Sequence, residues 1–184
     1  MHHDDMHDEI SFAQVGKPAP AFTVDAAVGQ TIKKISLSDY RGKWVVLFFY
    51  PLDFTFVCPT EITAFNDAYD TFAAMNTEVL AASVDSVHSH MAWMRHGLGE
   101  MKFPMLADLT KEISYQYNVL VEEEGIALRG VFVIDPDGIL KMAVVHDNSI
   151  GRNVNEVIRV VQAAQTGELC PVNWKPGDKT LGKA

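Results

Sequence analysis

Short, wholly apolar runs alternate with segments of helical periodicity in this chain, and this alternation limits its fold more than any other feature. Residues 44–50 and 79–84 are continuous apolar runs, as expected for strands covered on both faces of a sheet. Between them, apolar side chains recur every three or four residues, which predicts a helix face made of Ile62, Phe65, Tyr69 and Phe72. Strand, helix and strand in this order indicate an α/β protein.

The rest of the sequence extends the same pattern. The turn Asp135-Pro136-Asp137-Gly138 has proline and glycine where turns favour them, which predicts a β-hairpin of residues 130–134 and 139–145. The other expected elements are short edge strands at 21–24 and 31–35, a polar turn at 36–43, helical segments at 86–97 and 111–117, a loop or short strand at 104–108, and a last helix that ends before Gly167. Together they predict a mixed central sheet flanked by helices, for which the thioredoxin-like fold is the natural candidate.

The 184 residues are enough for one compact domain with a substantial core, and no linker or internal repeat divides them. We expect a flexible N-terminal arm over residues 1–16, a thioredoxin-like domain over 17–166, and a C-terminal tail over 167–184 that carries Cys170. The arm is rich in His and Asp. It is expected to be a solvated tail, because no partner ligands follow it in a fixed frame.

The chain is acidic, with a net charge of −9 and a pI of about 5.1. This charge argues against binding to nucleic acid or to an anionic membrane surface. The sequence has no run of about 18 apolar residues, so no transmembrane helix is predicted. The N-terminus lacks the apolar core of a signal peptide, which makes a cytoplasmic location the default expectation.

The sequence contains only two cysteines, Cys58 and Cys170. In a cytosolic chain, two cysteines indicate catalysis or redox chemistry rather than a structural disulfide framework. They are too far apart for a Cys-x-x-Cys site and too few for a cysteine-rich zinc site. No cofactor is predicted, since the sequence has no haem or flavin motif. No metal is predicted either, because the four histidines His88, His90, His96 and His146 are not spaced as the ligands of a metal site.

Cys58 lies where a buried strand has ended and a helix is predicted to begin. Pro59 fits the first helical position, and the acidic Glu61 is favoured in the first turn. The unpaired N–H groups of a helix N-terminus stabilise a thiolate, and Thr55 places a hydroxyl close by, so a reactive cysteine is favoured. The alternative interpretation is a small buried hydrophobe, which a free cysteine commonly is.

Ionisation alone does not make Cys58 a powerful catalyst. A free thiol is already a few per cent ionised near pH 7, so full ionisation gains only roughly ten- to thirtyfold in rate. A larger acceleration requires that the electrophile be positioned and the leaving group be stabilised by fixed hydrogen-bond donors. Thr55, the backbone N–H of Cys58 and an arginine are suitable donors.

The segment Pro51-Leu52-Asp53-Phe54-Thr55-Phe56-Val57-Cys58 resembles the active-site signature of typical two-cysteine peroxiredoxins. From about Phe12 to Lys179, the chain resembles the peroxidase subunits of bacterial alkyl hydroperoxide reductases. The other matching segments are FPMLAD at 103–108, LRGVFVID at 128–135, GRN at 151–153 and GELCPVNW at 167–174.

This resemblance implies a thiol-dependent peroxidase that reduces hydrogen peroxide and organic hydroperoxides. Cys58 matches the peroxidatic cysteine, which becomes a sulfenic acid, and Cys170 matches the resolving cysteine, which then closes an intersubunit disulfide. The remaining matches are Pro51, which shields the sulfur; Thr55, which hydrogen-bonds the peroxide and the thiolate; Arg129, which holds the thiolate; and Glu61, which orients the arginine.

Without the resemblance, three of these residues have simpler interpretations. Arg129 would be a surface arginine at a strand start, Glu61 a first-turn carboxylate favoured by the helix dipole, and Cys170 an idle exposed thiol. The resemblance further implies a homodimer that assembles into a decamer and needs no cofactor. Its electron donor would be thioredoxin or a dedicated disulfide reductase, and its role antioxidant defence and redox homeostasis.

Two other functions remain open from the residues. A cysteine hydrolase needs a histidine base near Cys58, and the loop that carries Cys58 offers threonine but no histidine. A holdase chaperone or structural ring needs an exposed assembly surface. Trp93 and Met94 on an exposed-looking helix are compatible with such a surface, although core packing is the simpler interpretation.

Overall fold

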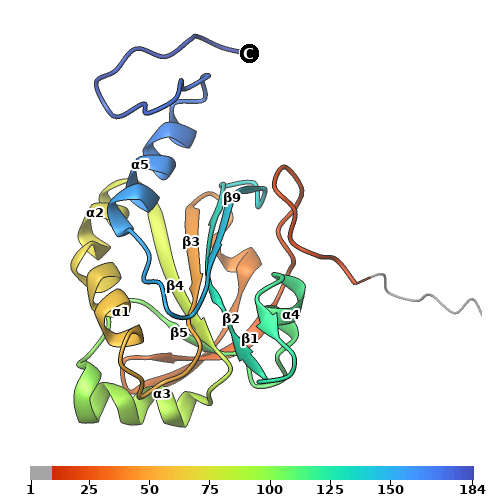
Figure 1. The fold of residues 1–184 in the computed structure, drawn as a ribbon, viewed down its shortest axis with the longest axis vertical. Coiled ribbons are helices and arrows are strands. Elements are labelled where there is room, and N and C mark those ends of the chain that lie inside the picture. Colours follow the sequence, from red (N-terminus) through yellow and green to blue (C-terminus); the bar gives the residue numbers. More distant parts are fainter. Residues whose placement is uncertain (1–9) are drawn as a thin grey trace, which may run out of the picture.

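A seven-stranded mixed sheet forms the centre of the molecule (Figure 1). The structure, a computed structural model, describes residues 10–184. The strands of this sheet are β1 Thr23–Val28, β2 Thr31–Ser36, β3 Trp44–Phe49, β4 Thr77–Ser83, β5 Met105–Ala107, β8 Arg129–Ile134 and β9 Leu140–His146. Their order is β2-β1-β5-β4-β3-β8-β9, in which β3, β4 and β5 are parallel and the other neighbours are antiparallel. The thioredoxin-like arrangement predicted from the sequence is therefore present.

Helices cover both faces of this sheet. One face packs against α1 Cys58–Asp67, α2 Tyr69–Ala74, α3 Val87–Trp93 and α5 Val154–Gln165. The other face packs against α4 Glu112–Gln116 and the segment before β1. Shorter elements are a 3-10 turn at Leu37–Tyr40, a π-helical turn at Met94–Leu98, and a separate two-stranded ladder of β6 Leu120–Val121 and β7 Ile126–Ala127.

The apolar run of β3 follows from the position of this strand at the centre of the sheet, where both of its faces are covered. Val46 and Phe48 point into the core under α1 and α5, whereas Val45, Leu47 and Phe49 point into the core under α4. Because successive side chains of a strand alternate between faces, a strand covered on both sides must be apolar throughout. The loop that follows β3 delivers Cys58 to the start of α1, at one end of the sheet.

The structure corrects several expectations about the elements. The strand predicted at 21–24 begins at Thr23, and it is interior rather than an edge, because Ala26 and Ala27 pair with β5. The helix after Cys58 is divided at Ala68 into α1 and α2. Trp93 and Met94 are buried in the core, so the exposure that would suit an assembly surface is absent.

The two ends of the described chain differ in how they are attached to the domain. Residues 10–16 are joined to the domain by hydrogen bonds from Ala13 N–H to the Gln116 carbonyl and from Gly16 N–H to the Leu140 carbonyl, each 2.8 Å. The His- and Asp-rich stretch 1–9, the larger part of the predicted arm, lies outside the described residues. Residues 167–184 contain neither helix nor strand and extend from the end of α5, away from the sheet (Figure 1). Within residues 10–184, no helix is long and apolar enough to cross a membrane.

Candidate active site

Cys58 is the first residue of α1, and its side chain is fully buried. Pro59 is therefore the second residue of the helix, whereas the sequence predicted it at the first helical position. Its missing N–H still costs nothing there, because none of the first four N–H groups of a helix has an intrahelical partner. The sulfur thus belongs to the first turn of the helix, whose N-terminal end carries partial positive charge, as expected for a reactive thiol.

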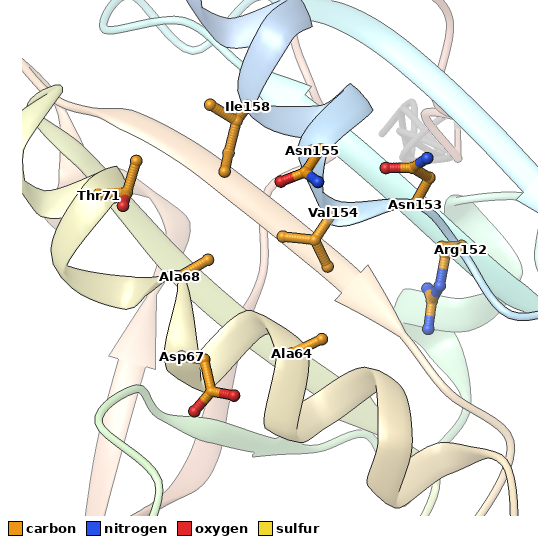
Figure 2. A pocket seen from close by; sticks show the side chains of 9 residues that line it. All are labelled: Ala64, Asp67, Ala68, Thr71, Arg152, Asn153, Val154, Asn155 and Ile158. Carbon is orange, nitrogen blue, oxygen red and sulfur yellow. The ribbon is translucent and has the colours of Figure 1, made fainter.

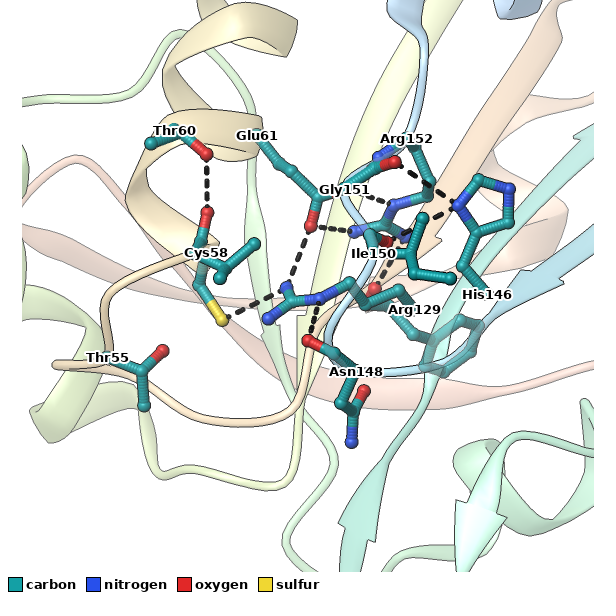
Figure 3. Close-up of polar contacts among 12 residues, drawn as sticks. Thr55, Cys58, Thr60, Glu61, Arg129, His146, Asn148, Ile150, Gly151 and Arg152 are labelled. Carbon is teal, nitrogen blue, oxygen red and sulfur yellow. Dashed lines mark hydrogen bonds and ion pairs between the residues drawn. The ribbon is translucent and has the colours of Figure 1, made fainter.

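Arg129 holds the Cys58 sulfur from the opposite side (Figure 3). It is the first residue of β8, and its Nη1 donates to Cys58 Sγ at 3.3 Å and to Glu61 Oε1 at 2.8 Å. Its Nε donates to the carbonyl of Asn148 at 2.9 Å. Among the described residues, Nη2 has no hydrogen-bond partner, so one arm of the guanidinium remains free as a donor beside the sulfur.

Glu61 lies one helical turn after Cys58 and joins Arg129 to a second arginine, Arg152. The Nε and backbone N–H of Arg152 each donate to Glu61 Oε2 at 2.7 Å, and its Nη2 donates to Oε1 at 3.1 Å. Burial alone would raise the pKa of Glu61. The hydrogen bonds and charge of Arg152, with the charge of Arg129, outweigh burial and hold the pKa of this carboxyl below its ordinary value of 4.5.

Arg152 is the site residue to which sequence reasoning assigned no role, although GRN at 151–153 was part of the resemblance. Its side chain is 1% exposed, and its Nη1 also donates to the carbonyls of Phe49 and Gly130, at the ends of β3 and β8. Burial lowers the pKa of Arg152 while Glu61 opposes this effect, and the guanidinium remains charged. Arg152 therefore fixes the helix of Cys58 to the central strands through Glu61.

Pro51 and Thr55 lie in the loop that leads to Cys58. Pro51 is buried, and the Thr55 hydroxyl donates to the Leu52 carbonyl at 3.0 Å. The hydroxyl oxygen can still accept a hydrogen bond, and Figure 3 shows the side chain of Thr55 on the sulfur side of the loop. The expected hydrogen bond between Thr55 and Cys58 is absent, since Arg129 is the one hydrogen-bond partner of Sγ among residues 10–184.

A buried polar network anchors the first half of this loop. Asp53 accepts from the Tyr50 hydroxyl at 2.6 Å and lies 2.8 Å from Nδ1 of His90, whose Nε2 is 2.9 Å from the Leu106 carbonyl. Burial, reinforced by Asp53, raises the pKa of Tyr50. His90 is thus a helix-packing histidine, as predicted. The network ties the loop to α3 and β5 and keeps this histidine away from Cys58.

The cysteine hydrolase considered from the sequence would need a histidine base beside Cys58. In the part of the chain that the structure describes, no histidine hydrogen-bonds to Cys58. His146 lies near the site, but its Nδ1 contacts the carbonyls of Ile150 and Gly151 at 3.3 Å (Figure 3). No group of three or more potential metal ligands is found in residues 10–184. Among the described residues no histidine is placed to act as a general base for Cys58, and the geometry suits a nucleophile that attacks a small electrophile beside Arg129.

Cys170 lies apart from these residues. It is half-buried, and its thiol donates to the Ala163 carbonyl near the C-terminal end of α5 at 3.6 Å. Arg152, two residues before α5, contacts the Cys58 helix. Ala163 is nine residues after Val154, the first residue of α5, which corresponds to a rise of about 14 Å. The structure thus brings together Cys58, Glu61 and Arg129 of the predicted site, with Pro51 and Thr55 in the adjoining loop, and leaves Cys170 at a distance.

The amino-acid sequence of the chain matches known protein families and several characterised or named relatives. The AhpC/TSA family matches residues 15–143, and the C-terminal domain of 1-Cys peroxiredoxin matches residues 162–184. A putative peroxiredoxin, YkuU of Bacillus subtilis (strain 168), is 53% identical over 175 residues, which cover 91% of this chain and 97% of the relative. Peroxiredoxin prdx-2 of Caenorhabditis elegans is 54% identical over 182 residues, which cover 94% of this chain and 90% of the relative.

Two solved structures of peroxiredoxins are similar to this chain in both fold and sequence. The crystal structure of reduced Plasmodium vivax 2-Cys peroxiredoxin matches with a TM-score of 0.89 and 41% identity, over 91% of this chain and 92% of that chain. The crystal structure of Enterococcus faecalis AhpC matches with a TM-score of 0.82 and 35% identity, over 85% of this chain and 98% of that chain. The predicted fold and the resemblance to peroxiredoxins are both confirmed.

Proposed function

The chain belongs to the AhpC/TSA family of peroxiredoxins, which are thiol peroxidases, and from this premise we propose that it reduces hydrogen peroxide and organic hydroperoxides through a sulfenic acid on Cys58. The observation that carries the proposal is the buried Arg129 guanidinium, whose Nη1 lies 3.3 Å from the sulfur. Removal of peroxide by this route would serve antioxidant defence and redox homeostasis.

The residues around Cys58 have distinct roles in the proposed step. The thiolate attacks one peroxide oxygen, so an S–O bond forms as the O–O bond breaks, and the departing oxygen takes a proton to leave as water or an alcohol. Nη2 of Arg129 is the free donor for the departing oxygen, and the Thr55 hydroxyl orients the substrate. Pro51 shields the sulfur from water, while Glu61 and Arg152 hold Arg129 in position.

Cys170 is proposed to resolve the sulfenic acid in a second copy of the chain. Its sulfur attacks that of Cys58, so the S–S bond forms as the S–O bond breaks and water leaves. A disulfide requires Cα atoms within about 7 Å. Cys170 packs near the far end of α5, so its own Cys58 is out of reach, which supports an intersubunit disulfide in a homodimer.

The rest of the proposal concerns assembly and recycling. The dimers are proposed to form a decamer, and the disulfide is proposed to be reduced by thioredoxin or a dedicated disulfide reductase. The cycle draws its electrons from this external dithiol, so the chain itself needs no bound cofactor.

Two complementary variants test the intersubunit disulfide. We co-express Cys170→Ser, which keeps Cys58 and is called the peroxidatic subunit, with size-tagged Cys58→Ser, which keeps Cys170 and is called the resolving subunit. After peroxide addition, a non-reducing gel is expected to show a mixed disulfide band at the sum of the two masses. Each variant treated alone cannot form this bond, because it lacks one of the two cysteines.

The wild-type chain provides the matching control on the same gel. It is expected to give a band near twice the 20.4 kDa monomer, which a reductant removes. A wild-type protein that consumes peroxide and loses both thiols while it stays monomeric on the gel would mean an intrachain bond, and the intersubunit assignment would be wrong.

A further inference from the structure

Residues 51–56, which we call the loop before Cys58, are joined to the rest of the molecule by very few hydrogen bonds. In the part of the chain that the structure describes, Asp53 is the only residue of this loop that hydrogen-bonds to another element. Its backbone N–H donates to Asp85 Oδ2 at 2.8 Å, and its carboxylate lies 2.8 Å from Nδ1 of His90 in α3. The other hydrogen bond of the loop joins two of its own residues. The position of the loop therefore depends on Asp53.

The residue after Asp53 is strained and also depends on α3. Phe54 has a φ of 59°, in the left-handed region that bulky residues rarely adopt and that persists only where the surrounding structure holds it. Its ring packs against Trp93, with 5.8 Å between the ring centroids. Trp93 and His90 are three residues apart and therefore share one face of α3. One face of α3 thus holds two consecutive residues of the loop.

His90 is fully buried, and both of its ring nitrogens face acceptors. Nε2 lies 2.9 Å from the Leu106 carbonyl, and Nδ1 lies 2.8 Å from Asp53 Oδ2. Since a carbonyl and an ionised carboxylate only accept hydrogen bonds, both are satisfied when the imidazole carries a proton on each nitrogen. The Tyr50 hydroxyl donates to the other oxygen of Asp53 at 2.6 Å. Nδ1 is therefore the donor that holds the loop, whereas Nε2 holds the histidine itself to β5.

Packing of α1 against α5 does not replace these contacts. A surface groove of about 620 Å³ lies between α1 and α2 on one side and the start of α5 on the other, and side chains as small as Ala64 line it (Figure 2). Arg152, which also lines the groove, binds Glu61 in the first turn of α1. The start of α1 is thus held by Arg152, and the loop that leads to it is held by Asp53.

We propose that Asp53 and His90 are positioning residues for the oxidation of Cys58, and that they act through the hydrogen bond donated by Nδ1. Asp53 is two residues before Thr55, a span of at most about 7 Å, so release of its carboxylate displaces the hydroxyl that orients the peroxide. A displacement of about 1 Å in such a group can lower a rate by about 10²-fold. The inference deepens the proposed function and rests on it.

Two amide variants of His90 separate its two hydrogen bonds. In His90→Asn the amide nitrogen takes the place of Nδ1 and can donate to Asp53, whereas in His90→Gln it takes the place of Nε2 and can donate only to the Leu106 carbonyl. Both are made in the Cys170→Ser protein, and stopped-flow mixing with hydrogen peroxide measures the rate constant for oxidation of Cys58. His90→Gln is expected to lower it on the order of tenfold, and His90→Asn by less than about threefold. A merely structural role would slow both equally, because both lose the ring and its charge.

Substitutions of Asp53 give a second comparison, which holds even if a His90 variant does not fold. Asp53→Asn keeps a side chain that can hydrogen-bond to both His90 and Tyr50, whereas Asp53→Ala keeps neither bond. Asp53→Ala is expected to be oxidised as slowly as His90→Gln, and Asp53→Asn is expected to resemble His90→Asn.

Cleavage by chymotrypsin reports the state of the loop without peroxide. Phe54 and Phe56 are 57% and 96% exposed, and cleavage after them requires that the loop open. Mass spectrometry of the peptides is expected to show faster cleavage at these two residues in His90→Gln than in His90→Asn. Cleavage at Tyr117, which is buried in the core, is expected to be the same in both and controls for global unfolding.

The possible outcomes are distinct. Equal oxidation rates for His90→Asn and His90→Gln, or for Asp53→Asn and Asp53→Ala, would overturn the positioning role. Slow oxidation of His90→Gln without faster cleavage of the loop would also overturn it. If the Cys170→Ser protein with no other substitution is not oxidised at Cys58, the proposed function itself is contradicted.

Discussion

Arg129→Gln is expected to lower the second-order rate constant for oxidation of Cys58 by hydrogen peroxide by about 10²–10³-fold, the usual cost of removing one preorganised donor from a developing anion. Glutamine keeps much of the length of the side chain but carries no charge. It cannot donate to Cys58, Glu61 and the Asn148 carbonyl at once, as the guanidinium does. Peroxide consumption in a stopped-flow experiment measures the rate.

Two further arginine variants sharpen this measurement. Arg95→Gln removes the same charge from an exposed position on the π-helical turn and is expected to leave the rate within about twofold of wild type. Arg129→Lys keeps the charge but has no planar fork, so it is expected to recover only part of the loss. If the Arg129→Gln protein reacts with peroxide as fast as the Arg95→Gln protein, Arg129 has no role in the oxidation of Cys58.

Glu61→Ala is expected to lower the free energy of unfolding by about 3–5 kcal/mol, because it leaves two buried arginines without their counter-charge. The side chains of Glu61, Arg129 and Arg152 are 4%, 3% and 1% exposed, so water cannot replace the lost carboxylate. Urea unfolding measures the change. Glu78→Ala, which breaks the exposed pair with Lys43, is the matched control and is expected to cost less than about 1 kcal/mol.

The pH dependence of this contribution has a definite sign. The pKa of Glu61 is lowered in the folded protein, since Arg152 and Arg129 outweigh the effect of burial. Its stabilisation is therefore fully present above its ordinary pKa of 4.5 and is lost as the pH falls through the lowered folded-state value. The stability difference between wild type and Glu61→Gln should stay constant down to about pH 5 and shrink below it. A difference that grows on acidification would contradict the ion-pair assignment.

The fold could be predicted where local pattern and global structure agree. The apolar run of β3 and the Pro-Gly turn between β8 and β9 each have a physical cause within a few residues, and both elements appear as expected. The interior place of β1 could not be predicted in this way. It depends on pairing with β5, which is distant in sequence and only three residues long.

In the candidate active site, too, some residues could be predicted from local sequence and others could not. Cys58 is recognisable from its place between a strand and a helix, but nothing local to Arg129 or Arg152 indicates that both converge on Glu61. Arg129 entered the site through the resemblance, and Arg152 was missed because its role depends on where the chain after β9 passes α1. A buried arginine is costly unless paired, yet burial cannot be read from the short Gly-Arg-Asn segment that carries Arg152.

The most direct test of the central claim is a sulfenic acid trap on the Cys170→Ser protein. One equivalent of hydrogen peroxide is added in the presence of dimedone, which captures sulfenic acids, and the modified peptides are identified by mass spectrometry. The account predicts that peroxide is consumed and that a single dimedone adduct forms on Cys58. Consumption of peroxide with Cys58 left as an unmodified thiol, or no consumption at all by the folded protein, would contradict it.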